Sequence, residues 1–402
     1  MMTPMVVYSK VINMLKLMDN FLENAVIKVI GVGGGGGNAI EHMVHSNIDG
    51  IEFIYANTDA QALQNATARS LVQLGASITK GLGAGTNPEI GRKSALEDKD
   101  RIYDVLEGSD MIFITAGMGG GTGTGAAPVV AEMAKELGIL TVAIVTTPFP
   151  FEGRKRIQIA DIGTKNLGLL VDSLITIPNV KLLSILGKGI TLLDAFKTAN
   201  NVLLGVVQGI ADLITRPGLI NVDFTDVRTV ISKIGIAMMG SGSARGGNRA
   251  RAAAETAVSG PLLKNINLAG ARGVLINITA GMDMSISEFE EVGDEVKIFT
   301  TDDATVIVGT VIDPYIFDEL KVTVVATGLG TLHNHEIIKK TENIKQHQIA
   351  KSNHINCFYQ EKPEQSVIVC HQNKFDNFEI TSIFKQSMNY LDIPSFLRRQ
   401  AN

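Results

Sequence analysis

The chain has 402 residues, of which 45% are hydrophobic, and a formal net charge of −5. This length suffices for two or three domains with a large core, and the lack of excess positive charge argues against nucleic acid as a partner. The two cysteines, Cys357 and Cys370, indicate neither a disulfide framework nor a metal cluster and favour a reducing cytoplasm. Charged residues interrupt the mildly apolar first 24 residues, so we expect neither a signal peptide nor membrane insertion.

Short apolar runs alternate with longer mixed segments through the first half of the chain. The strand-like runs cover residues 25–32, 51–56, 111–115, 139–146 and 174–177. This alternation predicts a parallel α/β sheet. Three later runs, at 273–279, 305–312 and 321–327, predict a second, smaller sheet.

A long helix is predicted between the two sheets, over residues 190–214. Its apolar stripe has 3,4 spacing and consists of Leu193, Phe196, Asn200, Leu203, Val207, Ile210 and Ile214. Thr191 and Asp194 resemble a capping box at its start. With 1.5 Å per residue the helix would be about 36 Å long, enough to connect two domains.

The first glycine-rich loop, Gly31 to Asn38, follows a strand and satisfies G-x-G-x-x-G. A dinucleotide site, and with it an NAD-dependent oxidoreductase, is therefore one hypothesis. A generic strand-to-helix turn also fits the motif. The dinucleotide hypothesis expects an acidic residue at the end of the second strand, where Ala56-Asn57-Thr58 stands instead.

A second glycine-rich loop, "AGMGGGTGTGAAP" at residues 116–128, also follows a strand. Two such loops, each preceding a helix, suit one extended polyphosphate, because unpaired N–H groups at helix N-termini favour anions. Thr122 and Thr124 add hydroxyl groups for a phosphate or a magnesium ion. The chain has no G-x-x-x-x-G-K-[ST], so a P-loop is excluded.

The segment "GGGTGTGAAP", Gly119 to Pro128, resembles the signature of the tubulin/FtsZ superfamily of GTPases. Blocks that resemble bacterial FtsZ proteins cover about residues 25–329 and the last dozen residues; they include "IKVIGVGGGGGNA", "NTDAQAL", "FEGRKR", "NVDFTDVR" and "LDIPSFLRRQA". The resemblance implies a Rossmann-type parallel-sheet GTPase domain, a long central helix, a smaller α+β domain and a disordered linker. We expect an N-terminal extension (1–24), a GTP-binding domain (25–189), the connecting helix (190–214), a GTPase-activating domain (215–330), a polar linker (331–389) and a partner-binding peptide (390–402).

The resemblance also implies a nucleotide site for GTP or GDP with Mg²⁺, without a separate protein-only metal site. Its expected nucleotide contacts are Gly34, Gly35, Gly36, Gly37, Asn38, Gly121, Thr122, Gly123, Glu152, Arg156, Phe196 and Asn200. Glu152 and Arg156 would bind ribose and phosphate, although an i,i+4 surface ion pair is the simpler interpretation. Asn200 would bind guanine beside Phe196, although bonding to neighbouring backbone is an alternative.

By the same resemblance, Asp223 and Asp226 form the catalytic pair and act on the nucleotide of the next subunit. A carboxylate there would orient and activate the attacking water. Head-to-tail contacts of this kind produce filaments. The alternative makes Asp226 an N-cap of a helix beginning at Val227.

The last residues form a short apolar peptide behind a polar linker. Its expected partner-binding residues are Leu391, Asp392, Ile393, Pro394, Phe396 and Leu397. Such a peptide suits a groove on a partner, and the resemblance implies membrane-tethering and regulatory division proteins such as FtsA. The implied function is a GTP-dependent, polymerising cytoskeletal protein of the bacterial division ring, cytoplasmic and at mid-cell on the inner face of the membrane. A tubulin-like filament that moves DNA is an alternative, against which the terminal peptide argues.

Overall fold

The computed structural model describes residues 25–329 except 47, 187–188, 217, 219, 221, 234, 261–262, 264–269 and 302. All of these residues belong to one structural unit that ends at His335. The expected N-terminal extension (1–24), polar linker (331–389) and partner-binding peptide (390–402) lie outside the described residues.

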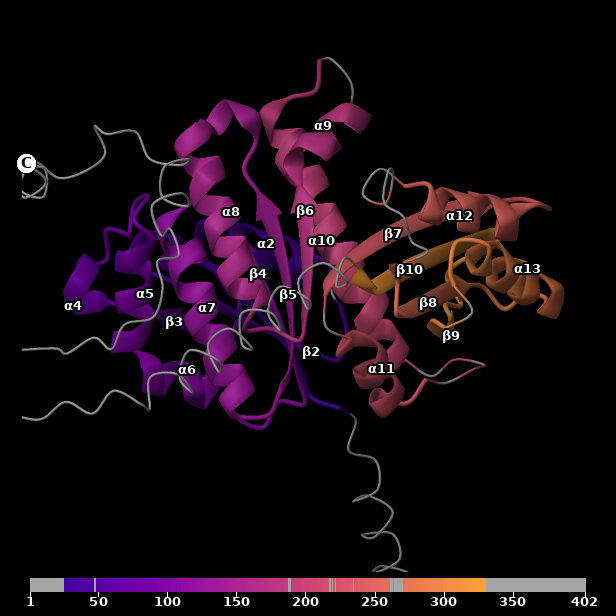
Figure 1. Cartoon of the computed structure of the whole chain (residues 1–402), viewed down its shortest axis with the longest axis horizontal. Helices are drawn as coiled ribbons and strands as arrows, with labels where there is room; N and C mark the ends of the chain where they lie inside the picture. Colours follow the sequence, from indigo (N-terminus) through magenta and orange to yellow (C-terminus); the bar gives the residue numbers. More distant parts are fainter. Residues whose placement is uncertain are drawn as a thin grey trace, which may run out of the picture. The chain divides into compact units, whose positions relative to one another are not determined.

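The described residues form a ten-stranded sheet in the order β3-β2-β1-β4-β5-β6-β7-β10-β8-β9 (Figure 1). The first six strands are β1 (Ile27–Val32), β2 (Ile51–Asn57), β3 (Ser70–Gln73), β4 (Met111–Gly117), β5 (Leu140–Thr147) and β6 (Ser173–Pro178). All their pairings are parallel. This confirms the parallel α/β sheet, and it explains why these strands read as nearly continuous apolar runs, since both faces are covered.

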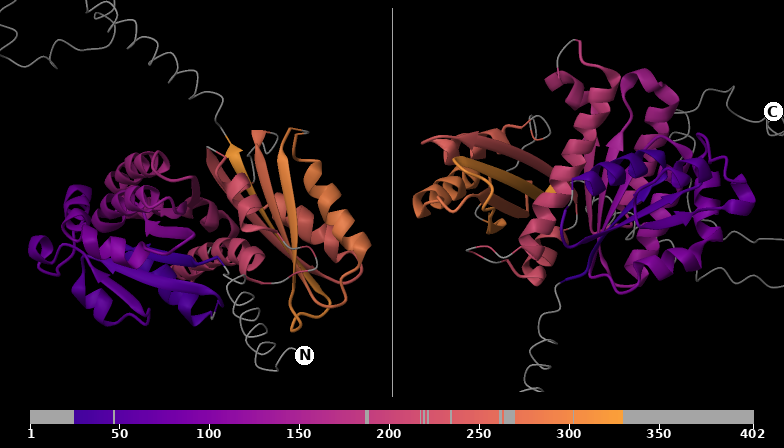
Figure 2. Two further views of the ribbon diagram at one scale, coloured as in Figure 1. Left: turned by 90° about the horizontal axis from the view of Figure 1, so that it is seen from below. Right: turned by 180° about the vertical axis from the view of Figure 1, so that it is seen from behind.

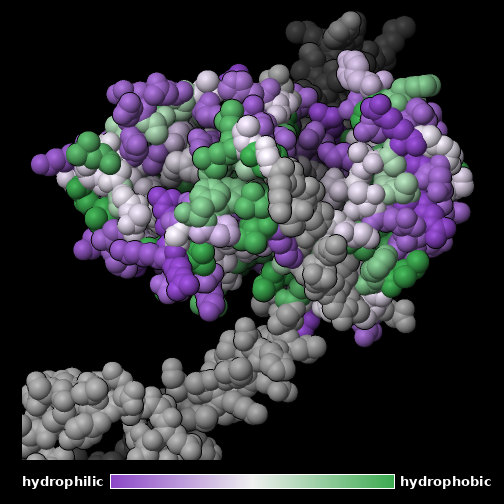
Figure 3. Space-filling view, turned by 90° about the horizontal axis from the view of Figure 1, so that it is seen from above, coloured by the Kyte–Doolittle hydropathy of each residue, from purple (hydrophilic) through white to green (hydrophobic). Residues whose placement is uncertain are grey.

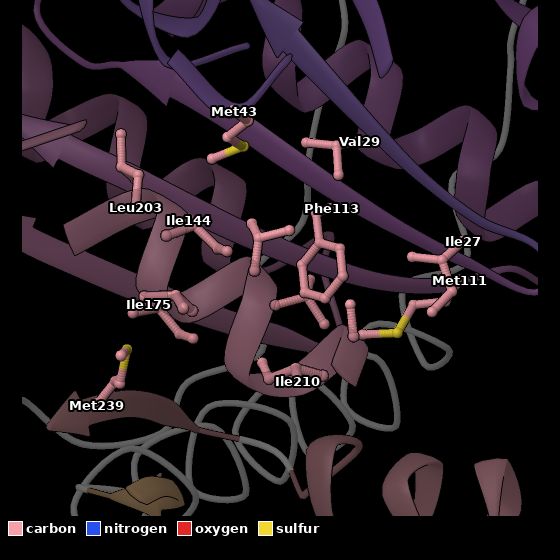
Figure 4. Packing of buried hydrophobic residues seen from close by; sticks show 14 of the residues in the cluster. Ile27, Val29, Met43, Met111, Phe113, Ile144, Ile175, Leu203, Ile210 and Met239 are labelled. Carbon is pink, nitrogen blue, oxygen red and sulfur yellow. The ribbon is translucent and has the colours of Figure 1, made fainter. Parts of the chain in front are cut away.

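Helices cover both faces of this parallel sheet. One face carries α2 (Gly33–His45) and α10 (Leu192–Thr215), and the other carries α5 (Pro88–Glu97), α6 (Lys99–Leu106), α7 (Gly121–Glu136) and α8 (Arg154–Gly168). Shorter helices are α3 (Ala60–Gln64), α4 (Ala76–Thr79), η1 (Pro150–Glu152) and α9 (Asn179–Leu186). Figure 4 shows the core on the α2 and α10 face, where Phe113 packs among Met43, Met111 and Ile210.

The second half contributes β7 (Ile236–Arg245), β8 (Gly273–Ala280), β9 (Thr305–Ile312) and β10 (Glu319–Leu329), with helices α11 (Phe224–Ile231), α12 (Arg249–Val258) and α13 (Ile286–Lys297). Strand β10 is antiparallel to both β7 and β8. The expected second sheet is therefore present, but it is not separate. Two residue pairs, Leu174 with Ile236 and Ile175 with Ala237, join β6 to β7 and make one continuous sheet.

The sequence did not indicate strand β7, because its middle reads Met-Gly-Ser-Gly-Ser. Glycine weakens a strand unless another backbone approaches closely. Here α12 does so, because an added Cβ at Gly240 would lie 1.9 Å from the carbonyl oxygen of Ala257, and one at Gly242 would lie 2.3 Å from that of Ala253. The small side chains of β7 and α12 thus let the helix lie directly on the strand.

Helix α10 runs between the two halves in both views of Figure 2. Its start is as expected, because the Thr191 hydroxyl accepts the Asp194 N–H at 3.1 Å. The expected stripe is buried from Leu203 to Ile210, whereas Leu193 is 63% exposed and Ile214 is half-buried. No helix among the described residues has the length and apolarity that a membrane span requires.

Candidate nucleotide site

The two glycine loops begin side by side at the carboxyl edge of the sheet. Strands β1 and β4 are parallel neighbours, and Val32 at the end of β1 is in register with Ala116 near the end of β4. Strand β5 lies next to β4, so the loop that carries Glu152 starts at the same edge. Ligands of open α/β sheets bind at this edge, outside the strand ends.

In the first loop, α2 begins directly after β1 with Gly33 in a left-handed conformation at φ 72°. Gly34, Gly35 and Asn38 are exposed. An added Cβ at Gly34 would meet nothing within 4 Å, whereas one at Gly37 would lie 2.1 Å from the Tyr55 ring. Gly34 therefore faces open space, and Gly37, like Gly36, is needed for packing of α2 on the sheet.

The second loop divides in the same way. An added Cβ at Gly120 would meet nothing within 4 Å. At Gly121 and Gly123, by contrast, it would approach backbone carbonyl oxygens to 2.7 Å and 2.6 Å, and at Gly125 it would lie 1.9 Å from the Pro88 oxygen. Several of these glycines therefore have a packing role, because they allow α7 to lie close to α5 and β4, apart from the phosphate contact expected from the sequence.

The two loop threonines bond within the chain. The hydroxyls of Thr122 and Thr58 lie 2.7 Å apart and are buried, and Thr124 accepts the Gly119 N–H at 2.9 Å. Thr58 is fully buried and stands in the "NTDAQAL" block, but no local pattern in the sequence indicates its contact with the second glycine loop. Within that block, Asp59 caps α3 by accepting the N–H groups of Gln61 and Ala62.

Glu152 and Arg156 form the i,i+4 ion pair, with 2.8 Å between Arg156 Nη1 and Glu152 Oε2. The other carboxylate oxygen of Glu152 accepts the Phe149 N–H at 2.8 Å. Glu152 therefore holds the turn after β5, and Arg156 remains 45% exposed at the edge that carries the loops.

Aromatic rings gather beside the start of α10. Phe149 is buried and stacks on Phe151 at 5.1 Å, while the edge contact between Phe149 and Phe196 is 5.3 Å. Phe151 is 61% and Phe196 is 42% exposed. Figure 3, which looks from above at the carboxyl edge, shows an apolar area near the middle of this face.

Asn200 lies one helical turn beyond Phe196 and contacts the first loop. Its Nδ2 donates to the Asn38 carbonyl at 3.5 Å, and the neighbouring Asn201 lies 2.6 Å from His42 Nε2. This is the backbone contact that the sequence analysis gave as the alternative, and it holds the beginning of α10 against α2. Because Asn200 is only half-buried, its side-chain amide needs no ligand to complete its hydrogen bonds.

Asp223 and Asp226 lie far from these loops, at the amino edge of the sheet. Arg228 of the same helix, α11, donates to the Gly138 carbonyl at 2.8 Å, and Gly138 precedes β5. Figure 1 shows α11 at the bottom of the molecule and α9 at the top. The N-cap interpretation of Asp226 is wrong: α11 begins at Phe224, Asp223 occupies the N-cap position without a side-chain bond, and Asp226 is exposed in the first turn.

The comparisons with known proteins agree on one family. The model of the Tubulin/FtsZ family, GTPase domain, matches residues 26–187, and that of the FtsZ family, C-terminal domain, matches residues 235–330. The "Cell division protein FtsZ" of Coxiella burnetii is 58% identical over 395 residues, which cover 96% of this chain and 99% of the relative. That of Pseudomonas aeruginosa is 57% identical over 399 residues, with 97% and 100% covered.

Solved structures give the same result. An empty FtsZ dimer from M. jannaschii superposes with a TM-score of 0.74 at 40% identity and covers 82% of this chain and 94% of its own. A GTPgS-bound protofilament of CetZ2 from Haloferax volcanii has a TM-score of 0.64, covering 80% of this chain and 99% of its own, and at 20% identity supports the fold alone.

Proposed function

This chain belongs to the FtsZ family of tubulin-like GTPases, and we propose that its own geometry divides the GTPase site between two subunits. The protein is a GTP-dependent, polymerising cell-division protein. The observation that carries the proposal is the separation between the two glycine loops and the two aspartates, which lie at opposite edges of one sheet.

The glycine loops bind the triphosphate of GTP in this proposal. Gly34 and Gly120 leave open space above backbone N–H groups at the starts of α2 and α7, where an anion is favoured. Asn38 and Gly35 extend the first loop, and Gly121 to Gly123 extend the second. Arg156 is exposed near the phosphates, and the exposed ring of Phe196 offers a surface on which guanine stacks near Asn200.

Magnesium fits this site only together with the nucleotide. The described residues contain no group of three side chains suited to hold a metal ion, and both loop threonines already bond within the chain. Mg²⁺ commonly keeps several waters and binds through substrate phosphates. We therefore expect Mg²⁺ to enter the site together with GTP between the two glycine loops, where it would neutralise phosphate charge.

A second copy supplies the aspartates. Helix α10 has 24 residues, so its ends are about 35 Å apart. Asn200 contacts α2, and Thr215, about 22 Å farther along the helix, lies against Gly50, whose added Cβ would be 3.1 Å away. A chain cannot bring its own Asp226 to its own loops across this length. When the amino edge of one copy stacks on the carboxyl edge of the next, the Asp226 of one chain reaches the glycine loops of the other. Such a heterologous contact repeats into a filament.

Asp223 and Asp226 then act on the attacking water. Both side chains are exposed, so a water molecule can reach either carboxylate before the next copy covers it. A carboxylate that orients and accepts a proton from water contributes about 10²–10⁴ in rate. Loop N–H groups stabilise the charge that develops on the γ-phosphoryl oxygens.

Filaments of this kind build the division ring at mid-cell in our proposal. The peptide at residues 390–402, outside the described residues, binds membrane-tethering and regulatory division proteins such as FtsA. Its apolar residues behind a polar linker support this role, because a free apolar segment suits docking into a groove.

The concentration dependence of turnover tests the shared site. We expect GTP hydrolysis per subunit to fall steeply when the full chain is diluted below its assembly threshold, while GTP binding persists. Asp226→Asn should bind GTP normally and lose about 10²-fold or more in turnover. Full turnover in isolated monomers would refute the shared site, and preferential binding of NAD or ATP would refute the nucleotide assignment.

A further inference from the structure

Two loops of the second half lie against each other beyond the ends of β8 and β9. The Asp313 N–H donates to the Ala280 carbonyl at 2.9 Å. An added Cβ at Gly281 would lie 2.2 Å from the Ile316 oxygen, so the two backbones are in contact. These loops therefore form one surface at the end of the sheet.

This surface exposes large apolar side chains. Met282 on the first loop is 85% exposed and Ile286 at the start of α13 is 81% exposed, and Tyr315 and Phe317 on the second loop are 95% and 84% exposed. We call these four residues the loop-tip patch. Single exposed apolar residues are ordinary, but a gathering on adjacent loops marks an interaction site.

The base of the patch is rigid. The buried guanidinium of Arg249 bonds to Asp283 Oδ2 at 2.6 Å and to Glu288 Oε1 at 2.7 Å, and its Nη1 lies 3.9 Å from Asp318 Oδ1. One side chain thus links the two loops and the start of α13. A preorganised surface loses little conformational entropy when a partner binds.

The surroundings of the patch are acidic. The loops and their ion-pair partners carry five carboxylates and two guanidinium groups, namely Asp283, Glu288, Asp313, Asp318 and Glu319 with Arg245 and Arg249. Net negative charge disfavours contact between two copies of the patch, because like charges would face each other. It favours an apolar segment that carries positive charge.

We propose that the patch binds the C-terminal peptide of this same protein, residues 390–402. This segment carries Leu391, Ile393, Phe396 and Leu397 and then Arg398 and Arg399. Its apolar residues match the exposed patch, and its two arginines match the acidic surroundings.

The length of the chain suits this contact. Strand β10 has 11 residues and leads from the patch to Leu329, a distance of about 36 Å. Residues 330–389 then connect Leu329 to the peptide. A tether of sixty residues can extend to about 200 Å, so it is long enough to bring the peptide back to the patch and to hold it there at a raised effective concentration.

Docking of the peptide has a consequence for the binding of division partners. A peptide on the loop-tip patch is withheld from any division partner, so the patch and the partner compete for it. The inference uses the tail that the proposed function assigns to partners, but its test needs neither GTP hydrolysis nor an anchor protein.

Photo-crosslinking in the full chain tests the contact. Phe317 is replaced by p-benzoylphenylalanine, and cross-linked peptides are identified by mass spectrometry. The matched control carries the same group at Leu82, which is 86% exposed in the first half. We expect cross-links from position 317, and not from position 82, to residues 390–402. Cross-links only to the folded part of another copy, or equal yields from both positions, would overturn the proposal.

Charge reversal separates specific docking from general attraction. Arg398→Glu with Arg399→Glu in the cross-linking chain should reduce the yield by about fivefold or more. Lys374→Glu with Lys385→Glu, a matched reversal in the linker, should reduce it by less than twofold or so. Equal losses in the two double variants would contradict recognition of the peptide itself.

Discussion

At the scale of single residues, the glycine loops combine two kinds of glycine that the sequence cannot separate. Gly34 and Gly120 face open space, whereas Gly37, Gly121 and Gly125 permit close contact within the fold. From the sequence, binding of a polyphosphate is the main explanation for the glycine density of the two loops. The packing reason depends on neighbours that are distant in the chain, such as Tyr55 against Gly37, and no local pattern reveals them.

Alanine substitutions distinguish the two kinds. Gly125→Ala should lower the free energy of unfolding by about 2 kcal/mol, because its Cβ would overlap the Pro88 carbonyl on α5. Gly34→Ala should leave that free energy unchanged or slightly higher, because its Cβ meets open space, and should weaken GTP binding. Urea unfolding and GTP titration measure both. Equal destabilisation by the two substitutions would contradict this division.

Arg249 gives the second half a pH-dependent stability. Hydrogen bonding to Arg249 lowers the pKa of both the Asp283 and the Glu288 carboxyl groups. Because the folded-state pKa values lie below the unfolded ones, the stabilisation is complete above about pH 5 and is lost as pH falls through the lowered values.

The variant Arg249→Met should remove this dependence. We expect a loss of about 1–3 kcal/mol in unfolding free energy at pH 7, since the carboxylates lose a buried partner. Between pH 5 and pH 3 the wild-type protein should lose more stability than the variant. Urea midpoints at each pH provide the comparison, with Arg251→Met, in an exposed ion pair with Glu255, as the control. Parallel pH profiles would contradict the assignment.

At the scale of elements, most strands were predictable because buried parallel strands read as short apolar runs. The exceptions have physical causes: β3 has only four residues, and β7 depends on α12 for its glycines. The sequence also predicted the extent and cap of α10 but not which part of its stripe is buried. Period alone cannot distinguish a residue packed in the core, such as Leu203, from one at an open edge, such as Leu193.

Two leucines of α10 test this difference with one kind of substitution. Leu203→Ala should reduce the free energy of unfolding by about 2–4 kcal/mol, because Leu203 is 3% exposed in the core. Leu193→Ala should cost less than about 0.5 kcal/mol, because Leu193 is 63% exposed. Chemical denaturation of both variants gives the two values. A large loss at position 193 would mean that the start of α10 is covered in solution.

At the scale of the whole molecule, the resemblance implied that the two aspartates act on the nucleotide of the next subunit, and the structure adds how far they lie from the glycine loops of their own chain. The glycine loops follow β1 and β4, whereas Arg228, beside Asp226, contacts the segment that precedes β5. Strand direction therefore puts the two candidate groups at opposite edges. The catalytic roles of Asp223 and Asp226 stay predictions, and the proposal that two subunits share one site depends on this separation.

Mixing two inactive variants tests whether the GTPase site is shared between two subunits. Gly34→Val should bind GTP poorly but keep its aspartates, and Asp226→Asn should keep its loops. An equal mixture should recover up to about a quarter of the wild-type rate, because that share of random junctions joins an intact loop to an intact aspartate. GTP turnover of the mixture and of each variant alone provides the measurement. Additive rates without recovery would contradict a site formed in trans.

Because β1, β4 and β5 are parallel, both glycine loops lie at one edge of the subunit, and the head-to-tail stacking that we propose makes the filament polar. One end of such a filament would expose a nucleotide pocket that holds GTP, and the other end would expose the carboxylates of Asp223 and Asp226. In the shared site that we propose, the pocket at that end has no neighbour to trigger cleavage, so the terminal subunit would keep its triphosphate and could exchange it with solvent. We therefore expect the two ends of a filament to differ chemically and to gain and lose subunits at different rates.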